Sequence, residues 1–561
     1  MKRFFVRSIV LIFIGIPIGS CKKAAEPAAA NSMPLVNLAA SMTNANTFSF
    51  SFTANASDAD NDPLKFIWDF GDGTVKEGGS TITFSFPANR EYVVKVSVTD
   101  GKSSPVQATV NINTNVTAVT INSYSPHQTM TGFGGFGAQD VPWSAGPYTS
   151  PEFINRLTDL GVSVLRDEVP TNFEYINDNA DPFVTDLSKY NLNTMTSGQH
   201  NPLGTRLQFF KDAKAAGITT FIATVWSPPT WMKTNNRIDN GTSANAAPPY
   251  NQSPSATDNQ LRVDMYNEFA EMCVAYVKIL KQQTGIDLYA FSIQNEPRFS
   301  QMYQSCIYNG AAMRDLLKVT GKRFKDEGLT TKLFIPEDVG YLDGVSGMVT
   351  PSLSDPDARQ YADIVAVHGY ALDGITANSP DAQTWQTMFG WGAQYGKPLW
   401  MTETSGYKND WSGALALSKA MYTALKFGNV SAWLFWTLSS STLDEYSLMS
   451  SSGAKSSRYY TSKNYYRWIR PGAIRIDADA VAGSKIYPLA FMHAANKETT
   501  MVLINDNTQP MVIKLGGTVL PATFNQFNTT ATDNCIDAGV INSADNILLP
   551  AGSVVTLYKK E

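Results

Sequence analysis

Two glutamates stand where strand-like apolar runs end. Glu296 lies just past the run Phe291–Gln294, and Glu403 follows the run Leu399–Thr402. Two carboxyl groups that converge can hydrolyse a glycosidic bond, because one protonates the leaving oxygen while the other meets the oxocarbenium-like carbon. An ordinary surface or salt-bridged glutamate is the alternative for each. The common position after a strand favours the chemical interpretation.

Eight short apolar runs alternate with amphipathic stretches between residues 131 and 464. This order is typical of a parallel sheet wrapped by helices, and eight such units close a (β/α)₈ barrel. Apolar residues at steps of three and four over Leu261–Ile279 predict a helix packed on that barrel. Catalytic side chains of such barrels stand at the carboxyl ends of strands, as both glutamates would. The predicted strands are Gly132–Gly137, Val164–Val169, Phe221–Trp226, Leu288–Gln294, Lys332–Pro336, Ile364–His368, Pro398–Thr402 and Val430–Thr437.

A second β-rich region follows the barrel. Residues 465–561 contain short strand-like runs, such as Met501–Ile504 and Ser553–Leu557, separated by Gly, Asn and Pro turns. This pattern predicts a side β-sandwich appended to the barrel. The segment 116–130 can add a strand to it, which would make barrel and sandwich a rigid pair.

Residues 41–115 have the pattern of a small immunoglobulin-like β-sandwich. The runs Trp68–Gly73 and Tyr92–Gly101 resemble the two signature strands of a PKD-type domain. That resemblance implies a spacer or a weak polysaccharide-contacting module rather than a catalyst. The preceding residues 21–40 are rich in Ala, Pro, Asn and Ser, which predicts a flexible tether.

Residues 1–20 predict a lipoprotein signal peptide. Three basic residues precede the apolar stretch Ile9–Ile18, which is too short to span a bilayer. The run Ile18–Cys21 resembles a bacterial lipobox, which implies acylation of Cys21; cleavage nearby without a lipid is the alternative. We therefore expect an outer-membrane lipoprotein, facing the periplasm or the cell surface and attached to the membrane only through Cys21.

Composition argues against several other classes of protein. A formal net charge of −5 provides no basic face for a nucleic acid. The four cysteines and four histidines lie far apart, so neither a zinc site nor a dense disulfide framework is predicted. The run Asp58–Asp62 superficially resembles a calcium loop, but Pro63 stands where such a loop needs Gly. We expect no metal, no cofactor and, by default, a monomer.

The barrel region resembles glycoside hydrolase family 30. The resemblance covers about Val116–Tyr558 and is carried by Thr131–Gly137, Val225–Lys233 and Trp468–Ala473. It implies a retaining barrel enzyme whose two carboxyl groups lie about 5 Å apart.

The same resemblance assigns roles to individual residues. Glu296 would be the acid/base, Glu403 the nucleophile that forms a glycosyl-enzyme, and Asn295 the donor to the sugar 2-hydroxyl. Arg166, at the end of the second predicted strand, would orient Glu403 and keep it ionised, since a nearby guanidinium depresses a carboxylate pKa. An ordinary structural ion pair is the alternative for Arg166.

Five more residues are candidates for binding the substrate. His368 and Tyr370 end the sixth predicted strand, where they would hydrogen-bond Glu403 or line the subsite. Trp226, Trp231 and Trp436 would stack on sugar rings, whose axial C–H faces suit an aromatic surface. Each of the five can instead be a core residue.

The expected substrate is a plant cell-wall polysaccharide, and an endo-β-1,4-xylanase acting on xylan, arabinoxylan or glucuronoxylan is the first interpretation. Glucuronoxylan-specific members of the family carry arginines just after the eighth strand, where this chain has Thr437–Ser441. Lys455 or Arg458 would have to replace them. The alternatives are a β-1,6-glucanase or a glucosylceramidase-like β-glycosidase of the same family, and a non-catalytic polysaccharide-binding lipoprotein.

Overall fold

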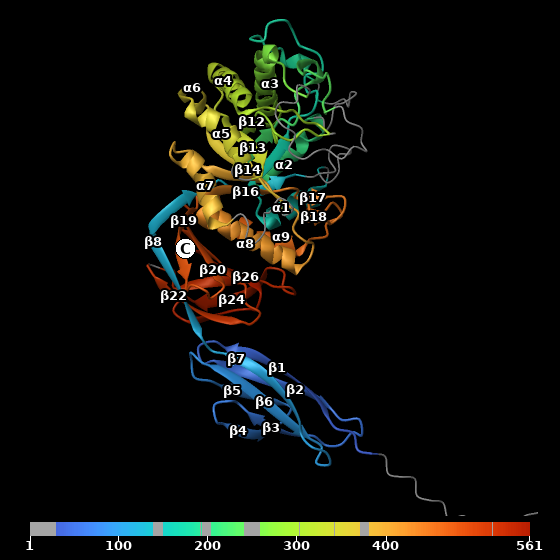
Figure 1. Ribbon diagram of the computed structural model, residues 1–561, viewed down its shortest axis with the longest axis vertical. Coiled ribbons are helices and arrows are strands. Elements are labelled where there is room, and N and C mark those ends of the chain that lie inside the picture. The colour runs from blue at the N-terminus through green and yellow to red at the C-terminus, as the bar shows by residue number, and fades with distance from the viewer. Residues whose placement is uncertain are drawn as a thin grey trace, which may run out of the picture. The chain divides into compact units, whose positions relative to one another are not determined.

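The computed structural model describes residues 30–137, 148, 150–190, 192, 203–240, 259–301, 303–340, 343–370, 381–518 and 520–561. They form an N-terminal unit that ends at Asn113 and a larger unit that continues from Thr114 to Glu561 (Figure 1). The predicted signal peptide, the predicted lipidation site Cys21 and the start of the predicted tether lie outside the described residues. Within the described part of the chain, no helix is long and apolar enough to cross a bilayer.

The N-terminal unit is built from two sheets around an aromatic core. One sheet has the order β1-β2-β5 and the other β4-β3-β6-β7. Phe52, Trp68, Phe70 and Val96 are fully buried between them. The strands are β1 (Leu35–Asn44), β2 (Ser49–Ser57), β3 (Lys65–Asp69), β4 (Val75–Gly78), β5 (Thr81–Ser85), β6 (Glu91–Thr99) and β7 (Val106–Asn113).

The tether prediction was wrong for its last residues. Strand β1 begins at Leu35 and pairs along its whole length with β2, from Leu35 opposite Ser57 to Asn44 opposite Ser49. Only Leu38 of this strand is buried, while Val36 and Met42 on the same face are half-buried, so the strand lacks the continuous buried apolar run by which the barrel strands were predicted.

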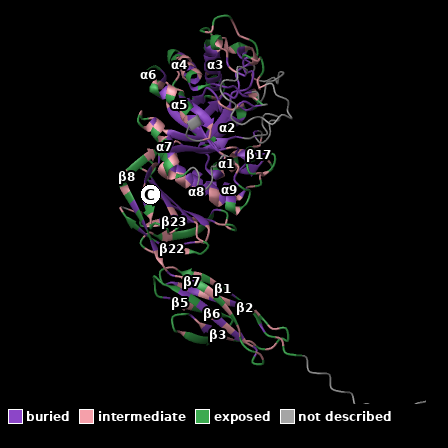
Figure 2. Ribbon diagram, in the orientation of Figure 1, coloured by how far each residue is buried: buried purple, intermediate pink, exposed green. Residues whose placement is uncertain are grey.

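The eight predicted barrel strands are confirmed. They close a parallel barrel in chain order, with β16 paired to β9. Val164, Ile222, Phe334, Trp400 and similar residues fill its interior, and nearly every residue of these strands is buried (Figure 2). The strands are β9 (Gly132–Phe136), β10 (Val164–Glu168), β11 (Thr220–Thr224), β12 (Ala290–Ser292), β13 (Lys332–Val339), β14 (Ile364–His368), β15 (Leu399–Glu403) and β16 (Val430–Phe435).

Helices surround the barrel (Figure 1). The predicted helix at Leu261–Ile279 is real but begins later, at Tyr266, because Leu261 pairs with Lys233 in an isolated β-bridge. The helices are α1 (Pro151–Leu160), α2 (Leu207–Ala215), α3 (Tyr266–Thr284), α4 (Gly310–Asp326), α5 (Asp343–Ser354), α6 (Pro356–Arg359), α7 (Ala382–Ala393), α8 (Trp411–Phe427) and α9 (Ser457–Tyr466), with two short strands, β17 (Ser439–Ser440) and β18 (Met449–Ser450), after the barrel.

The side domain is one hydrogen-bonded sheet of nine strands. Its order is β24-β23-β26-β21-β20-β19-β8-β22-β25, and β8 pairs antiparallel with β19 and parallel with β22, as predicted for the segment 116–130. The strands are β8 (Val116–Thr129), β19 (Ile474–Ala480), β20 (Ile486–His493), β21 (Glu498–Asn505), β22 (Met511–Gly517), β23 (Thr523–Thr529), β24 (Ile536–Asn542), β25 (Asn546–Leu549) and β26 (Ser553–Lys560).

Side chains alternate between the two faces of these strands, and one face of the side domain packs against the barrel. On β21, Val502 and Ile504 belong to the same core cluster as the barrel helices, whereas Met501 and Leu503 belong to the separate core of the side domain. Successive residues of a strand point to opposite faces, so one strand serves two cores. The barrel therefore rests on one face of the side sheet.

The glycine-rich strand β9 yields a test of barrel closure. A methyl group added at Gly134 would lie 1.7 Å from the carbonyl oxygen of Val164 on β10. We expect Gly134→Ala to lower the free energy of unfolding by about 1–3 kcal/mol or more, because a packed barrel has no room to yield. Gly390→Ala is the matched control: Gly390 lies exposed inside α7, and a methyl group added there would meet no atom outside the neighbouring helix backbone within 4 Å, so alanine should stabilise the helix by about 0.5–1 kcal/mol. Denaturant unfolding measures both, and equal effects would contradict the prediction.

Candidate active site

Glu296 and Glu403 come together at the carboxyl end of the barrel. Glu403 is the last residue of β15, and Glu296 lies four residues beyond β12. One carboxylate oxygen of each lies within 4.8 Å of the other. Retaining glycosidases have such a separation, about 5–5.5 Å, whereas inverting enzymes need roughly 6.5–9.5 Å to admit a water.

Burial keeps Glu296 in its protonated form to unusually high pH. The side chain is buried, which raises its pKa to about 7, and the hydrogen bond to His368 only partly offsets this effect. Its carboxylate oxygen Oε1 lies 3.1 Å from Nδ1 of His368. The backbone has φ 46°, and its N–H donates to the carbonyl oxygen of Glu337 at 2.8 Å. A carboxyl with such a pKa can deliver a proton near neutral pH and take it back.

Glu403 is bound on both of its oxygens. The Nη1 of Arg166 donates to Oε2 at 2.5 Å, and the hydroxyl of Tyr370 donates to Oε1. Burial, followed by the negative charge of Glu403, raises the pKa of Tyr370 far above its usual value, so the phenol remains a donor. Two donors, one on each oxygen, fix the orientation of this carboxylate.

Arg166 links the predicted site residues. Its guanidinium is fully buried and contacts Glu403, Oδ1 of Asn295 at 2.7 Å and Oε1 of Glu337 at 2.8 Å. The planar group also lies over the ring of Trp226, 4.6 Å from its centroid. Because the donors of a guanidinium form a rigid fork, these contacts fix the acceptors relative to one another.

Glu337 is a site residue that the sequence analysis missed. It is fully buried in β13, has φ 57°, and accepts a hydrogen bond from Thr224 Oγ1 at 2.9 Å. Burial alone would raise its pKa, but Arg166 and His368 outweigh burial and lower it. The signal was present: Glu337 directly follows the predicted strand Lys332–Pro336, at the same kind of position as Glu403.

His368 completes the charged cluster. Its Nδ1 also lies 3.8 Å from Glu403, and its Nε2 lies 3.5 Å from Oε1 of Glu337. Burial would lower its pKa, but the surrounding carboxylates, Glu403 first, raise it to about 9. His368 is therefore a cation at neutral pH.

The three tryptophans predicted to bind sugar lie in different surroundings. Trp226 and Trp436 have ring centroids 6.0 Å apart and both pack on Phe136 at the end of β9. Trp226 touches Arg166, so this pair belongs to the wall of the site. Trp231 is fixed elsewhere: its indole N–H donates to the carbonyl oxygen of Glu174 at 2.9 Å.

Two groups of described residues have ligand atoms close enough for a metal ion. One is Glu296, His368 and Glu403. Cationic Arg166 already contacts Glu403 and His368 itself is cationic, which disfavours a further positive ion there. The other group, Asp58, Asp62 and Asp100 in the N-terminal unit, overlaps the aspartate run noted in the sequence.

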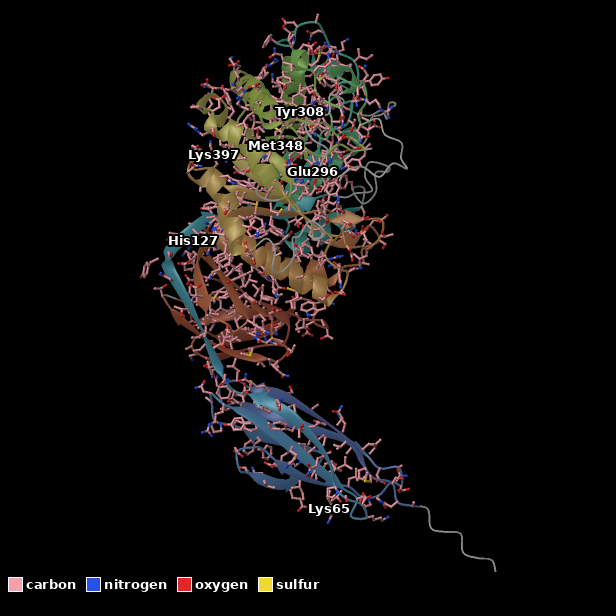
Figure 3. All side chains as sticks on the ribbon, viewed as in Figure 1. Lys65, His127, Glu296, Tyr308, Met348 and Lys397 are labelled. Carbon is pink, nitrogen blue, oxygen red and sulfur yellow. The ribbon has the colours of Figure 1, made fainter. Side chains whose placement is uncertain are left out.

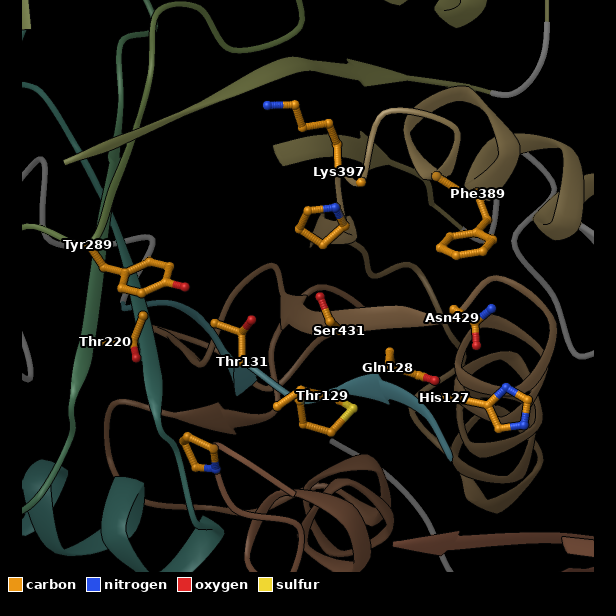
Figure 4. Close-up of a pocket in the computed structure, with 15 residues that line it drawn as sticks. His127, Gln128, Thr129, Thr131, Thr220, Tyr289, Phe389, Lys397, Asn429 and Ser431 are labelled. Atoms are coloured by element: carbon orange, nitrogen blue, oxygen red, sulfur yellow. The ribbon is translucent and has the colours of Figure 1, made fainter. Parts of the chain in front are cut away.

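A separate cavity of about 670 Å³ opens at the opposite, amino end of the barrel (Figure 4). Thr220 begins β11, and Tyr289 and Pro398 immediately precede β12 and β15. Figure 3 accordingly shows Lys397 and His127, which line this cavity, well away from Glu296. Catalytic residues of such barrels stand at the other end, so this cavity is not the catalytic site.

Comparison with known proteins identifies the barrel. The family model described as glycosyl hydrolase family 30 TIM-barrel domain matches residues 173–442, which include both glutamates and six of the eight barrel strands, β11 to β16. The barrel of this chain thus matches the glycoside hydrolase family 30 domain. It is therefore an O-glycosyl hydrolase of the retaining, double-displacement type. The PKD domain model matches residues 31–116, which include β1.

Relatives of the family 30 domain differ in substrate. Glucuronoxylanase XynC of Bacillus subtilis is 25% identical over 443 residues, which are 76% of this chain and 88% of the relative. An endo-1,6-β-D-glucanase of Neurospora crassa is 30% identical over 189 residues, 33% of this chain and 34% of the relative. The solved xylanase Xyn30A of Clostridium acetobutylicum has the same fold, with a TM-score of 0.62 and 24% identity over 79% of this chain and all of that chain.

Replacing Arg166 tests how far the site depends on this cation. Arg166→Met leaves the buried Glu337 and Glu403 without their guanidinium, so we expect a loss of about 3–5 kcal/mol in the free energy of unfolding at pH 7. Arg166 lowers the pKa of Glu337, and this interaction makes the wild-type protein more stable than the variant. The difference in stability disappears as falling pH protonates the carboxylates in both proteins. The deficit should therefore shrink at pH 4.

The matched control removes an exposed arginine. Arg237 pairs with Asp239 at the surface, with 54% of its side chain exposed, and Arg237→Met should cost less than about 1 kcal/mol at either pH. A deficit for Arg166→Met that stays the same at pH 4 would contradict the electrostatic origin.

Proposed function

We propose that the protein is a retaining endo-β-1,4-xylanase that cuts the uncharged backbone of xylan, with Glu403 as nucleophile and Glu296 as acid/base. The single observation that carries the proposal is the pair of carboxyl groups within 4.8 Å of one another, one doubly bound by donors and the other buried with a pKa of about 7. This difference in surroundings supports two different roles for the same residue type.

The first step forms a glycosyl-enzyme. Glu403 attacks the anomeric carbon while Glu296 transfers its proton to the departing glycosidic oxygen, so the bond between carbon and that oxygen breaks as the ester bond forms. Arg166 and Tyr370 both donate hydrogen bonds to Glu403 and orient it for the attack. Asn295, whose Oδ1 accepts from Arg166, keeps its amide N–H₂ available for the sugar 2-hydroxyl.

The second step releases the sugar with its configuration retained. Glu296, now ionised, removes a proton from water as the water attacks the anomeric carbon and displaces Glu403. Loss of the ester restores the negative charge next to Glu296, which raises the pKa of Glu296 again. The acid is thereby ready for another cycle.

The surroundings of the eighth strand support an uncharged backbone as substrate. Arg458 is buried and donates to backbone carbonyls, among them that of Ser447 at 3.0 Å, and Lys455 pairs with Asp159 at 3.0 Å. Neither candidate cation is left to bind a glucuronate branch. We therefore infer that a charged branch is not required, unlike the preference that the name of the Bacillus relative implies.

Single substitutions combined with azide test the two roles. Glu403→Ala and Glu296→Ala should each reduce xylan hydrolysis by about 10²–10⁴-fold or more. Azide needs no general base, so with an activated aryl xyloside it should rescue both variants. It should give the α-glycosyl azide with Glu403→Ala, by one displacement, and the β-azide with Glu296→Ala, by two. If NMR instead showed the β-azide with Glu403→Ala and the α-azide with Glu296→Ala, the assignment of nucleophile and acid/base would be reversed.

A panel of polysaccharides tests the substrate. We expect rates within about threefold on glucuronoxylan and on the same xylan freed of glucuronate, because neither Lys455 nor Arg458 is available to recognise the branch. Linear β-1,6-glucan and glucosylceramide should be poor substrates, and Glu403→Ala is the blank for each. Strict dependence on glucuronate would contradict the uncharged specificity. Faster cleavage of β-1,6-glucan would instead favour the glucanase alternative, which the partial match to the Neurospora enzyme supports.

A further inference from the structure

Glu337 contacts each cation of the catalytic cluster without contacting either catalytic carboxyl group through its own side chain. Its Oε1 lies 2.8 Å from Nε of Arg166 and 3.5 Å from Nε2 of His368, and its Oε2 accepts from Thr224. Its main-chain oxygen accepts the N–H of Glu296. The side chain is fully buried, so its charge acts on these neighbours with little screening by water.

The charges around the two catalytic glutamates balance only when Glu337 is counted. Arg166 and His368 are cations, Glu403 must be an anion to attack, and Glu296 must be neutral to protonate the leaving group. These four groups alone carry a net charge of +1, which would favour ionisation of Glu296. With the negative charge of Glu337 the buried cluster is neutral, and Glu296 can remain protonated.

We propose that Glu337 is a positioning residue that compensates the charges of Arg166 and His368 and thereby keeps Glu296 in its acid form. The inference rests on the proposed roles of Glu296 and Glu403. Glu337, at the register shift within β13, and Glu296, in the loop after β12, both have a left-handed backbone, which is a costly conformation for a non-glycine residue and is typical of functional sites. The hydrogen bond between the two backbones ties the position of the acid to that of Glu337.

Other titratable groups at the cluster do not replace this charge. Tyr370, on the Glu403 side, stays a neutral phenol. Asp338, next along β13, is buried and its charge also raises the pKa of Glu296, but it is paired with its own arginine, Arg298. Among the described residues, Glu337 is therefore the carboxylate besides Glu403 that contacts both Arg166 and His368.

The test is the pH dependence of kcat/KM on a xylo-oligosaccharide, whose poor leaving group requires the acid. Glu337→Gln keeps the shape of the side chain and removes its negative charge, which lowers the pKa of the titratable groups in the cluster. We expect the alkaline limb, at which activity is lost as Glu296 deprotonates, to move to lower pH by roughly one to two units. Glu337→Asp keeps the charge on a shorter side chain, so its limb should stay near the wild-type position even where the rate falls.

Asp167→Asn is the matched control for removal of a buried carboxylate. Asp167 lies on β10 next to Arg166, but its side chain pairs with Arg206 and accepts from Tyr276, away from the catalytic cluster. This variant should lose thermal stability without moving the alkaline limb. If the alkaline limb of Glu337→Gln does not move and the rate is lower by the same factor at every pH, Glu337 is only structural and the inference is overturned. Full activity of Glu296→Ala on the same oligosaccharide would instead overturn the proposed function, so the two failures are distinguishable.

Discussion

The buried guanidinium of Arg166 is the interaction on which the site depends. It comes from β10 and joins side chains from β13, β15 and the loop after β12, up to 237 residues away in the sequence. An unpaired charge cannot be buried cheaply, so this arginine is tolerated only because acceptors surround it, and they in turn are tolerated because of it. The same buried contacts therefore determine both the geometry of the site and the stability of the barrel mouth.

The position of each partner follows from barrel closure. Parallel strands in register bring their carboxyl ends to one rim, where Glu403, His368 and Glu337 all stand. The registry shifts between β13, β14 and β15, next to these three residues, adjust how far each side chain projects. Bulges of this kind commonly redirect a side chain beside an active site.

The sequence predicted the barrel well because its strands are buried on both faces and appear as continuous apolar runs. The same criterion failed for β1, in which only Leu38 is buried. Glu403 and Glu337 follow predicted strands in the same way, yet only the former lies in a sequence context that the family resemblance assigns. The charge balance was beyond prediction, because it depends on distances between residues that only closure of the barrel brings together. Tryptophans were equally ambiguous, since Trp226 beside Arg166 and Trp231 bonded to Glu174 look alike in a sequence.

The strand β8 imposes an order on the biogenesis of the molecule. It precedes the barrel, yet its neighbours β19 and β22 are synthesised more than 300 residues later. Contacts so distant along the chain make folding slow, because a large loop must close before they form. The sheet that supports the barrel cannot be completed until the last strands exist. A nascent chain therefore keeps this sheet unfinished until its last residues are synthesised, and a version that lacks its C-terminal strands would expose β8 as an unpaired edge.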